Sequence, residues 1–191
     1  MELLGVGIGR SGTYSLAAWL RASFEPHFNQ LQYPGSDQAA CKYIASLHCD
    51  RVVGHNFKTY IPLVEKIWPD CKYIWLRRLR DENVASLARC NFGVHAHADR
   101  VGSIGQLNVP LEIEDRQTKA EWLYDRASEV LTRDLLAIPS GRKRIVWLHE
   151  IDDQRTELAE WLGDPELAER PFPHRNATKP SAIKPGTIPS L

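Results

Sequence analysis

The sequence lacks the features of a membrane protein and of a protein held together by disulfides. No stretch of about eighteen apolar residues, the length a membrane-spanning helix needs, occurs in its 191 residues. Its four cysteines (Cys41, Cys49, Cys71 and Cys90) form no Cys-x-x-Cys pair, so we expect reduced thiols. The first residues carry no basic segment ahead of an apolar core, as a secretory signal would. We therefore expect a soluble, cytoplasmic protein without a membrane partner.

An excess of positive charge is also missing. The 24 basic and 24 acidic residues cancel at pH 7. A protein that binds nucleic acids in general carries a net positive field, so we expect no nucleic-acid partner and only a local anion site. His95 and His97 alternate, but neither cysteines nor a carboxylate cluster accompany them. The sequence therefore predicts no metal site.

Strand and helix patterns alternate along the chain. The predicted strands are residues 3–6, 52–53, 73–76 and 145–148. One predicted helix carries Leu16, Trp19, Leu20 and Phe24 on one face, and the next begins at Ser36. Of the others, one spans 61–68, one runs through 84–88, one spans 118–137, and one ends at Gly163. This alternation predicts a three-layer α/β/α fold with a mostly parallel central sheet, whose ligand lies outside the carboxyl ends of the strands.

Two segments interrupt this pattern. Residues 91–112 show no clear periodicity, and we expect a long loop or lid there. Six of the twelve prolines lie beyond Asp164. We therefore predict one domain over 1–163, and an extended, proline-rich arm over 164–191 that packs on that domain or closes over it.

A glycine-rich turn, Gly7-Ile8-Gly9-Arg10-Ser11-Gly12, joins the first strand to the first helix. Such a turn can cradle a phosphate with its backbone N–H groups. Compared with the nucleotide-triphosphate loop, Thr13 stands where the lysine belongs and Tyr14 where the magnesium-binding hydroxyl belongs, which disfavours ATP or GTP hydrolysis. The dinucleotide pattern also fits, but no acidic residue ends the stretch 28–33. A turn that holds no ligand is also disfavoured, because Arg10 beside Ser11, Gly12 and Thr13 concentrates hydrogen-bond donors that serve no packing purpose.

Several motifs together resemble one family. Gly7 to Thr13 is similar to the 5'-phosphosulfate loop of sulfotransferases that use 3'-phosphoadenosine 5'-phosphosulfate (PAPS). Arg78 at the end of a strand, with Ser86 eight positions later, resembles the pair that grips the nucleotide 3'-phosphate in that family. His55 stands about where many members carry a catalytic histidine, and 147–163 resembles the end of the family domain. The resemblance covers about residues 3–163.

The resemblance implies a P-loop NTPase-like sulfotransferase fold. It also implies metal-independent, in-line transfer of a sulfuryl group from PAPS to a hydroxyl or amine of a small-molecule or glycan acceptor. The nucleotide-binding residues it implies are Gly9, Arg10, Ser11, Gly12, Thr13, Tyr14, Ser15, Arg78, Ser86 and Arg175. Tyr14 replaces a threonine common in the family, so Ser15 is the alternative hydroxyl. Arg175 lies in the segment 173–179, which we expect to close over the nucleotide.

Two of these residues have expected chemical roles. Arg10, a permanent cation, would stabilise the departing phosphate, and His55 would accept the acceptor's proton. Glu112, Glu114 and Asp115 compete with His55 for the role of base. Two other functions stay open, a small-molecule kinase with a degenerate P-loop and a catalytically silent nucleotide-binding module. The sequence sets neither the acceptor nor the oligomeric state.

Overall fold

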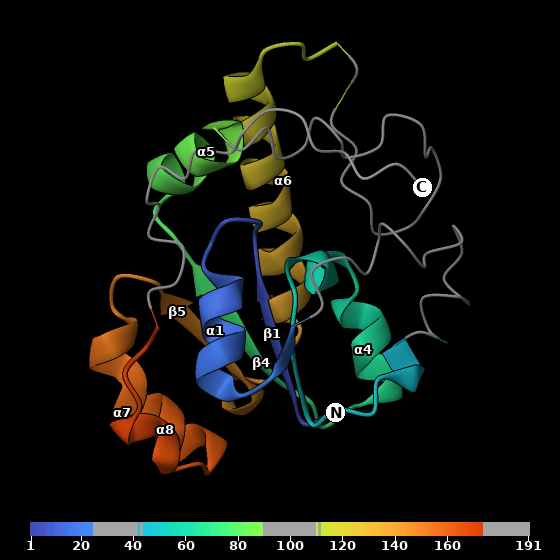
Figure 1. Ribbon diagram of the computed structural model, residues 1–191. Helices are drawn as coiled ribbons and strands as arrows, with labels where there is room; N and C mark the ends of the chain where they lie inside the picture. Colours follow the sequence, from blue (N-terminus) through green and yellow to red (C-terminus); the bar gives the residue numbers. More distant parts are fainter. Residues whose placement is uncertain (25–41, 43, 90–109, 111, 174–191) are drawn as a thin grey trace, which may run out of the picture.

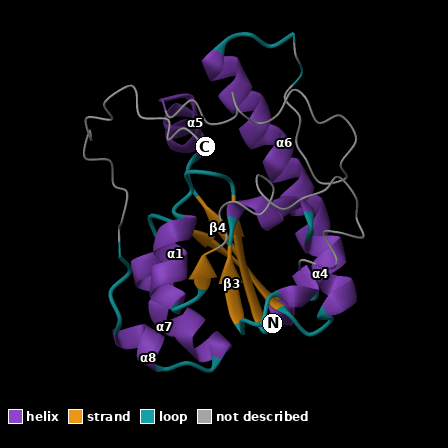
Figure 2. Cartoon of the chain, turned by 45° about the vertical axis from the view of Figure 1, so that its right-hand side comes forward, coloured by secondary structure: helices purple, strands orange, loops and turns teal. Residues whose placement is uncertain are grey.

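The computed structural model describes residues 1–24, 42, 44–89, 110 and 112–173. In this part of the chain, parallel strands form a five-stranded sheet in the order β2-β3-β1-β4-β5 (Figure 2). The strands are β1 (Leu3–Gly7), β2 (Ser23–Phe24), β3 (Arg51–Val53), β4 (Lys72–Arg77) and β5 (Lys143–Trp147). The predicted parallel sheet is confirmed.

Helices cover both faces of this sheet (Figure 1). The α-helices are α1 (Thr13–Leu20), α4 (Ile61–Ile67), α5 (Arg80–Arg89), α6 (Arg116–Leu136), α7 (Ile151–Leu162) and α8 (Glu166–Glu169). The 3-10 helices are η1 (His55–Thr59) and η2 (Ser140–Arg142). One apolar cluster joins the sheet to α1, α7 and α8, and a second joins it to η1, α4, α5 and α6. The predicted three-layer α/β/α architecture is confirmed.

The central strand β1 is buried along its whole length. Leu4 and Val6 pack into the cluster beneath α6, whereas Leu3 packs into the cluster beneath α1. This alternation follows from the two-residue period of a strand. Burying each such side chain stabilises the fold by about 1.5–3 kcal/mol. A strand with helices on both faces is therefore apolar throughout, which is why its sequence is a continuous apolar run.

The first helix is shorter than the sequence predicts. α1 ends at Leu20 because Arg21 adopts a left-handed conformation, with φ 52°, and the N–H of Ala22 bonds to the carbonyl of Ala17. The chain then turns into β2, where Phe24 pairs with Val53. The expectation that Phe24 lies on the helical face is wrong, because pairing with β3 draws it into the sheet.

The last described strand is only partly buried. β5 runs from Lys143 to Trp147, Val146 is buried, and Ile145 is 47% exposed. β5 lies at the end of the strand order, with β4 as its neighbour. An apolar run predicts a strand, but it does not predict whether helices cover both faces of that strand.

The first residues of the predicted C-terminal arm form a short helix and pack against the fold. Residues 166–169 form α8, and Leu167 and Phe172 are buried in the cluster that contains Trp19. The indole N–H of Trp19 donates to the carbonyl of Arg170 at 3.2 Å, and Arg170 donates back to the carbonyl of Trp19 at 3.0 Å. Residues 164–173 therefore pack against the rest of the described fold.

Some of the predictions made from the sequence concern residues that the structure does not describe. The start of the helix predicted from Ser36, almost all of the predicted loop 91–112, and the arm beyond residue 173 with Arg175 lie outside the described residues. Within the described part of the chain, none of the helices combines the length and the apolar character that crossing a bilayer requires.

Candidate functional site

The predicted site residues come from three neighbouring strands. β1 lies between β3 and β4 in the sheet, and all three strands run in the same direction. The turn after β1 therefore lies at the same sheet edge where β4 leads toward α5 (Figure 1). On the other side, the N–H of Gly54 bonds to the carbonyl of Gly5 at 3.0 Å, so His55 follows directly beside β1. The fold brings His55 and Arg78 to opposite sides of one glycine turn.

The turn itself has the backbone of an anion cradle. Arg10 has φ 69° and Gly12 has φ 96°, both in the left-handed region, and the N–H of Ser11 bonds to the carbonyl of Ile8 at 3.0 Å. Gly12 precedes α1 and has no side chain that could cap its N-terminus. Left-handed turns of this kind direct successive N–H groups to one spot, next to the positive end of the helix dipole.

Close packing explains the first glycine of the turn. A Cβ atom at Gly7 would overlap Ser11 Oγ and would lie 2.9 Å from Thr13 Cγ2 and 3.1 Å from the carbonyl oxygen of Leu76. The turn folds back onto β1 and β4 so tightly that a larger residue must displace backbone.

The polar residues of the turn and of the first helical turn have different environments. The side chains of Ser11, Thr13 and Ser15 are buried. Tyr14 is 43% exposed, and its ring contacts Phe24 edge-on, with ring centroids 5.2 Å apart. Tyr14 therefore lies against β2, and its expected role in the cradle stays a prediction that rests on its backbone N–H.

The two predicted nucleotide-binding motifs meet in the structure. Arg10 Nε donates a hydrogen bond to Ser86 Oγ at 3.3 Å, and a terminal nitrogen of Arg78 donates to the carbonyl of Arg10 at 3.5 Å. Arg78 also forms an ion pair with Glu82 at 2.9 Å, and its own carbonyl accepts a hydrogen bond from Tyr124. Two cations and a hydroxyl from separate parts of the sequence thus surround one place beside the glycine turn.

His55 begins η1 and is half-buried at the end of β3. The ammonium group of Lys58 donates to the carbonyl of His55 at 3.1 Å. Burial lowers the pKa of Lys58 to about 8, because desolvation disfavours the charged form. Our sequence reasoning did not single out Lys58. The signal that could have indicated Lys58 is its position, three residues after the predicted histidine on a short helix at the strand end.

No model of a protein family matches the sequence, and no curated protein matches it. The sulfotransferase domain of the curacin biosynthetic pathway superposes with a TM-score of 0.60 and 13% identity, over 87% of this chain and 76% of that one. The sulfotransferase domain of the Synechococcus PCC 7002 olefin synthase gives 0.55 and 11%, over 85% and 73%. The sulfotransferase STF9 from Mycobacterium avium gives 0.54 and 13%, over 86% and 64%.

This chain has the sulfotransferase fold. At 11–13% identity the likeness to these three structures shows the fold alone, and the chemistry has to be argued from the residues of the site.

One competitor for the role of base has a structural function in this sulfotransferase fold. The carboxylate of Asp115 accepts hydrogen bonds from the N–H and the hydroxyl of Thr118, at 2.7 and 2.8 Å, and caps α6. These hydrogen bonds hold the pKa of Asp115 below its ordinary value. A carboxylate engaged in this way is a poorer proton acceptor than a free one.

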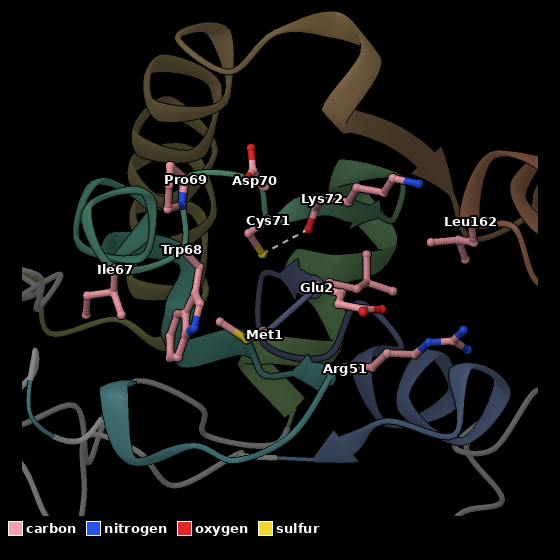
Figure 3. A pocket seen from close by; sticks show the side chains of 11 residues that line it. Met1, Glu2, Arg51, Ile67, Trp68, Pro69, Asp70, Cys71, Lys72 and Leu162 are labelled. Carbon is pink, nitrogen blue, oxygen red and sulfur yellow. Dashed lines mark hydrogen bonds between the residues drawn. The ribbon is translucent and has the colours of Figure 1, made fainter.

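A pocket of about 360 Å³ lies at the opposite, amino edge of the sheet (Figure 3). Its basic residues are already paired, Lys72 with the carbonyl of Trp161 at 2.7 Å and Arg51 with Asp164 at 2.6 Å. None of the predicted site residues lines it.

Among the described residues, no three His, Cys, Asp or Glu side chains lie close enough together to hold a metal ion.

Proposed function

We propose that this protein is a sulfotransferase that moves a sulfuryl group from PAPS to a hydroxyl or amine of a small-molecule or glycan acceptor. The contact between the glycine turn and the Arg78–Ser86 pair carries this proposal. A donor with phosphates at its 5' and 3' positions needs two anion sites a short distance apart. A single triphosphate chain would need the lysine and magnesium hydroxyl whose positions Thr13 and Tyr14 occupy.

The turn and α5 would divide the two phosphates between them. The N–H groups of Ser11, Gly12 and Thr13 and the N-terminus of α1 suit the 5'-phosphate. Arg78 and Ser86 suit the 3'-phosphate, because a guanidinium can bind a phosphate through two parallel hydrogen bonds. Arg10 lies between the two sites, with its carbonyl at Arg78 and its side chain at Ser86.

The reaction breaks the bond between sulfur and the 5'-phosphate oxygen, and the electron pair stays on that oxygen. Arg10 and the N–H groups of the turn would stabilise this charge as it forms, without help from a metal ion. The acceptor oxygen or nitrogen forms the new bond to sulfur and releases its proton to His55. The donor leaves as 3',5'-ADP.

Calorimetry with 3',5'-ADP and 5'-AMP in EDTA tests the nucleotide site. We expect 3',5'-ADP to bind about tenfold more tightly or better, since its extra phosphate gains charge-assisted hydrogen bonds. Equal affinity for the two nucleotides would contradict the proposal. Transfer from PAPS to a panel of phenols, sugars and amines tests the reaction. Magnesium-dependent ATP turnover would favour the kinase, and binding without any transfer would favour the silent module.

A further inference from the structure

Asn83 is a buried polar residue without a visible partner. It lies on α5, three residues before Ser86 and on the same buried face of the helix. Its side chain is fully buried, and neither its amide nitrogen nor its amide oxygen has a hydrogen-bond partner. An apolar residue at this position would pack without that cost, because an unpaired buried amide loses its bonds to water and gains none in return.

Other side chains that lie near Asn83 in space also have buried polar atoms. Ser11 Oγ, Trp75 Nε1 and Arg77 Nε are also buried without a hydrogen-bond partner. All four side chains line one closed pocket, together with Arg78 and Tyr124, and in this conformation it has no free volume for a water molecule. Buried polar groups are usually satisfied in proteins, so several unsatisfied groups around one pocket indicate a binding function. The pocket adjoins the glycine turn through Ser11 and the proposed 3'-phosphate site through Arg78.

The pocket is rich in donors. The indole of Trp75 and the Nε of Arg77 can only donate hydrogen bonds, and the amide of Asn83 offers two more N–H groups. None of the residues that line the pocket carries a carboxylate. Donors next to a guanidinium suit an oxyanion and exclude a cation.

Two hydrogen bonds near this pocket are long, although Arg78 also pairs with Glu82 at 2.9 Å. The hydrogen bond from Arg10 Nε to Ser86 measures 3.3 Å and that from Arg78 to the Arg10 carbonyl 3.5 Å, both longer than a typical N–H···O bond. A phosphate offers both cations shorter, charge-assisted bonds. Moving the Arg78 side chain, which lines the pocket, onto a phosphate would open the pocket toward it.

We propose that the Asn83 amide is a further binding residue for the 3'-phosphate of the nucleotide, beside Arg78 and Ser86. The inference rests on the proposed function, because it takes the donor's 3'-phosphate as the ligand. It assigns to Asn83, together with Arg78, the specificity for a 3'-phosphorylated nucleotide over one that carries only a 5'-phosphate.

Asn83→Leu tests this, because leucine has a similar size and no polar atoms. We expect the variant to bind 3',5'-ADP about tenfold more weakly, to bind 5'-AMP as the wild type does, and to melt at the same or a higher temperature. A purely structural role would not weaken binding in a protein that is equally stable. Ser128→Ala is the matched control, since Ser128 has another buried hydroxyl without a partner but does not line the pocket. Its affinity for both nucleotides should stay unchanged.

Two results would overturn the inference while the proposed function stands. One is an Asn83→Leu protein that binds both nucleotides like the wild type, and the other is an equal loss for both. If leucine prevents folding, Asn83→Ala removes the amide without adding volume and is judged by the same criteria. A wild type that does not prefer 3',5'-ADP over 5'-AMP contradicts the proposed function, and this inference with it.

Discussion

Arg10 and Ser86 are hydrogen-bonded across 76 positions of the sequence, with 3.3 Å between Nε and Oγ. The contact ties the glycine turn after β1 to α5, which follows β4. Since β1 and β4 are neighbours in a parallel sheet, their carboxyl ends necessarily lie side by side.

Arg78→Ala should weaken binding of 3',5'-ADP about tenfold or more and affect 5'-AMP far less. The lost guanidinium is the cation that we assign to the 3'-phosphate. Arg80→Ala is the matched control, because Arg80 is two residues away and pairs with Asp125 on the surface at 2.8 Å. Calorimetry measures both nucleotides with both variants. A similar loss with Arg80→Ala would indicate a general electrostatic effect rather than a site at Arg78.

Gly7→Ala should destabilise the protein by about 1–3 kcal/mol and abolish nucleotide binding, because the added methyl group overlaps the packed turn. Gly141→Ala serves as the control, since no atom lies within 4 Å of a Cβ placed there. Urea unfolding followed by tryptophan fluorescence measures the stability of both variants. An unchanged unfolding free energy in Gly7→Ala would show that the turn is not packed as described.

His55→Ala should slow sulfuryl transfer by about 10²–10⁴-fold while 3',5'-ADP binding is preserved, because the proposed base does not touch the nucleotide phosphates. His48→Ala, at an exposed position before β3, should behave like the wild type. Normal transfer by His55→Ala would refute the assignment.

Lys58→Met should raise the melting temperature at pH 7, and the gain should shrink toward pH 10. Burial lowers the pKa of Lys58 to about 8, from an ordinary value of about 10.4. Below pH 8 the folded protein therefore bears the cost of a buried charge. Between these two pKa values the unfolded chain binds more protons, so the stability of the wild type rises with pH. Calorimetric melting at several pH values measures the difference, with the exposed Lys66→Met as control. A gain that stays constant with pH would contradict the prediction.

Arg142→Met should cost about 1–3 kcal/mol of unfolding free energy at pH 7. Arg142 binds the carboxylate of Glu65 through two hydrogen bonds, at 2.9 and 2.7 Å, and Tyr73 donates a third at 2.7 Å. Burial raises the pKa of Glu65, but these hydrogen bonds outweigh that effect and leave the pKa below its ordinary value.

This shift sets the pH dependence of the Arg142 variant. A carboxylate with a lowered pKa contributes stability above its unfolded pKa and loses it as the pH falls through the folded one. The cost of Arg142→Met should therefore decrease in acid. Urea unfolding at pH 7 and pH 3.5 checks this, with the exposed Arg126→Met as a control of small effect. A cost that is the same at both pH values would indicate that charge plays no part.

The elements that the sequence predicted well carry local signals. β4 is an apolar run bounded by charged residues, and Gly163 ends α7 with φ 72°, as the cap glycine predicts. The elements that it predicted poorly depend on distant partners. β2 exists because β3 pairs with it, and α8 packs because Leu167 contributes to the cluster beneath α1.

Asn83 shows the same limit at the site. The three residues before it are charged, so nothing local distinguishes it from a surface residue of a polar helix. It is buried because α5 packs against α6 and over the end of β4, which places Trp75 and Tyr124 around it. Burial of this kind is a property of packing between elements and cannot be read from one helix alone.

By itself, the sequence determined that a glycine turn follows a buried strand. It also determined that Arg78 stands at the end of another strand and that Ser86 follows it by about two helical turns. Both are short-range properties of the backbone, set by glycine's conformational freedom and by the helical period. Only the tertiary structure decided that these pieces meet, because hydrogen bonding between β1 and β4 sets which strand ends are neighbours. That pairing, rather than either motif, places Arg10 against Ser86 and encloses Asn83 beside them.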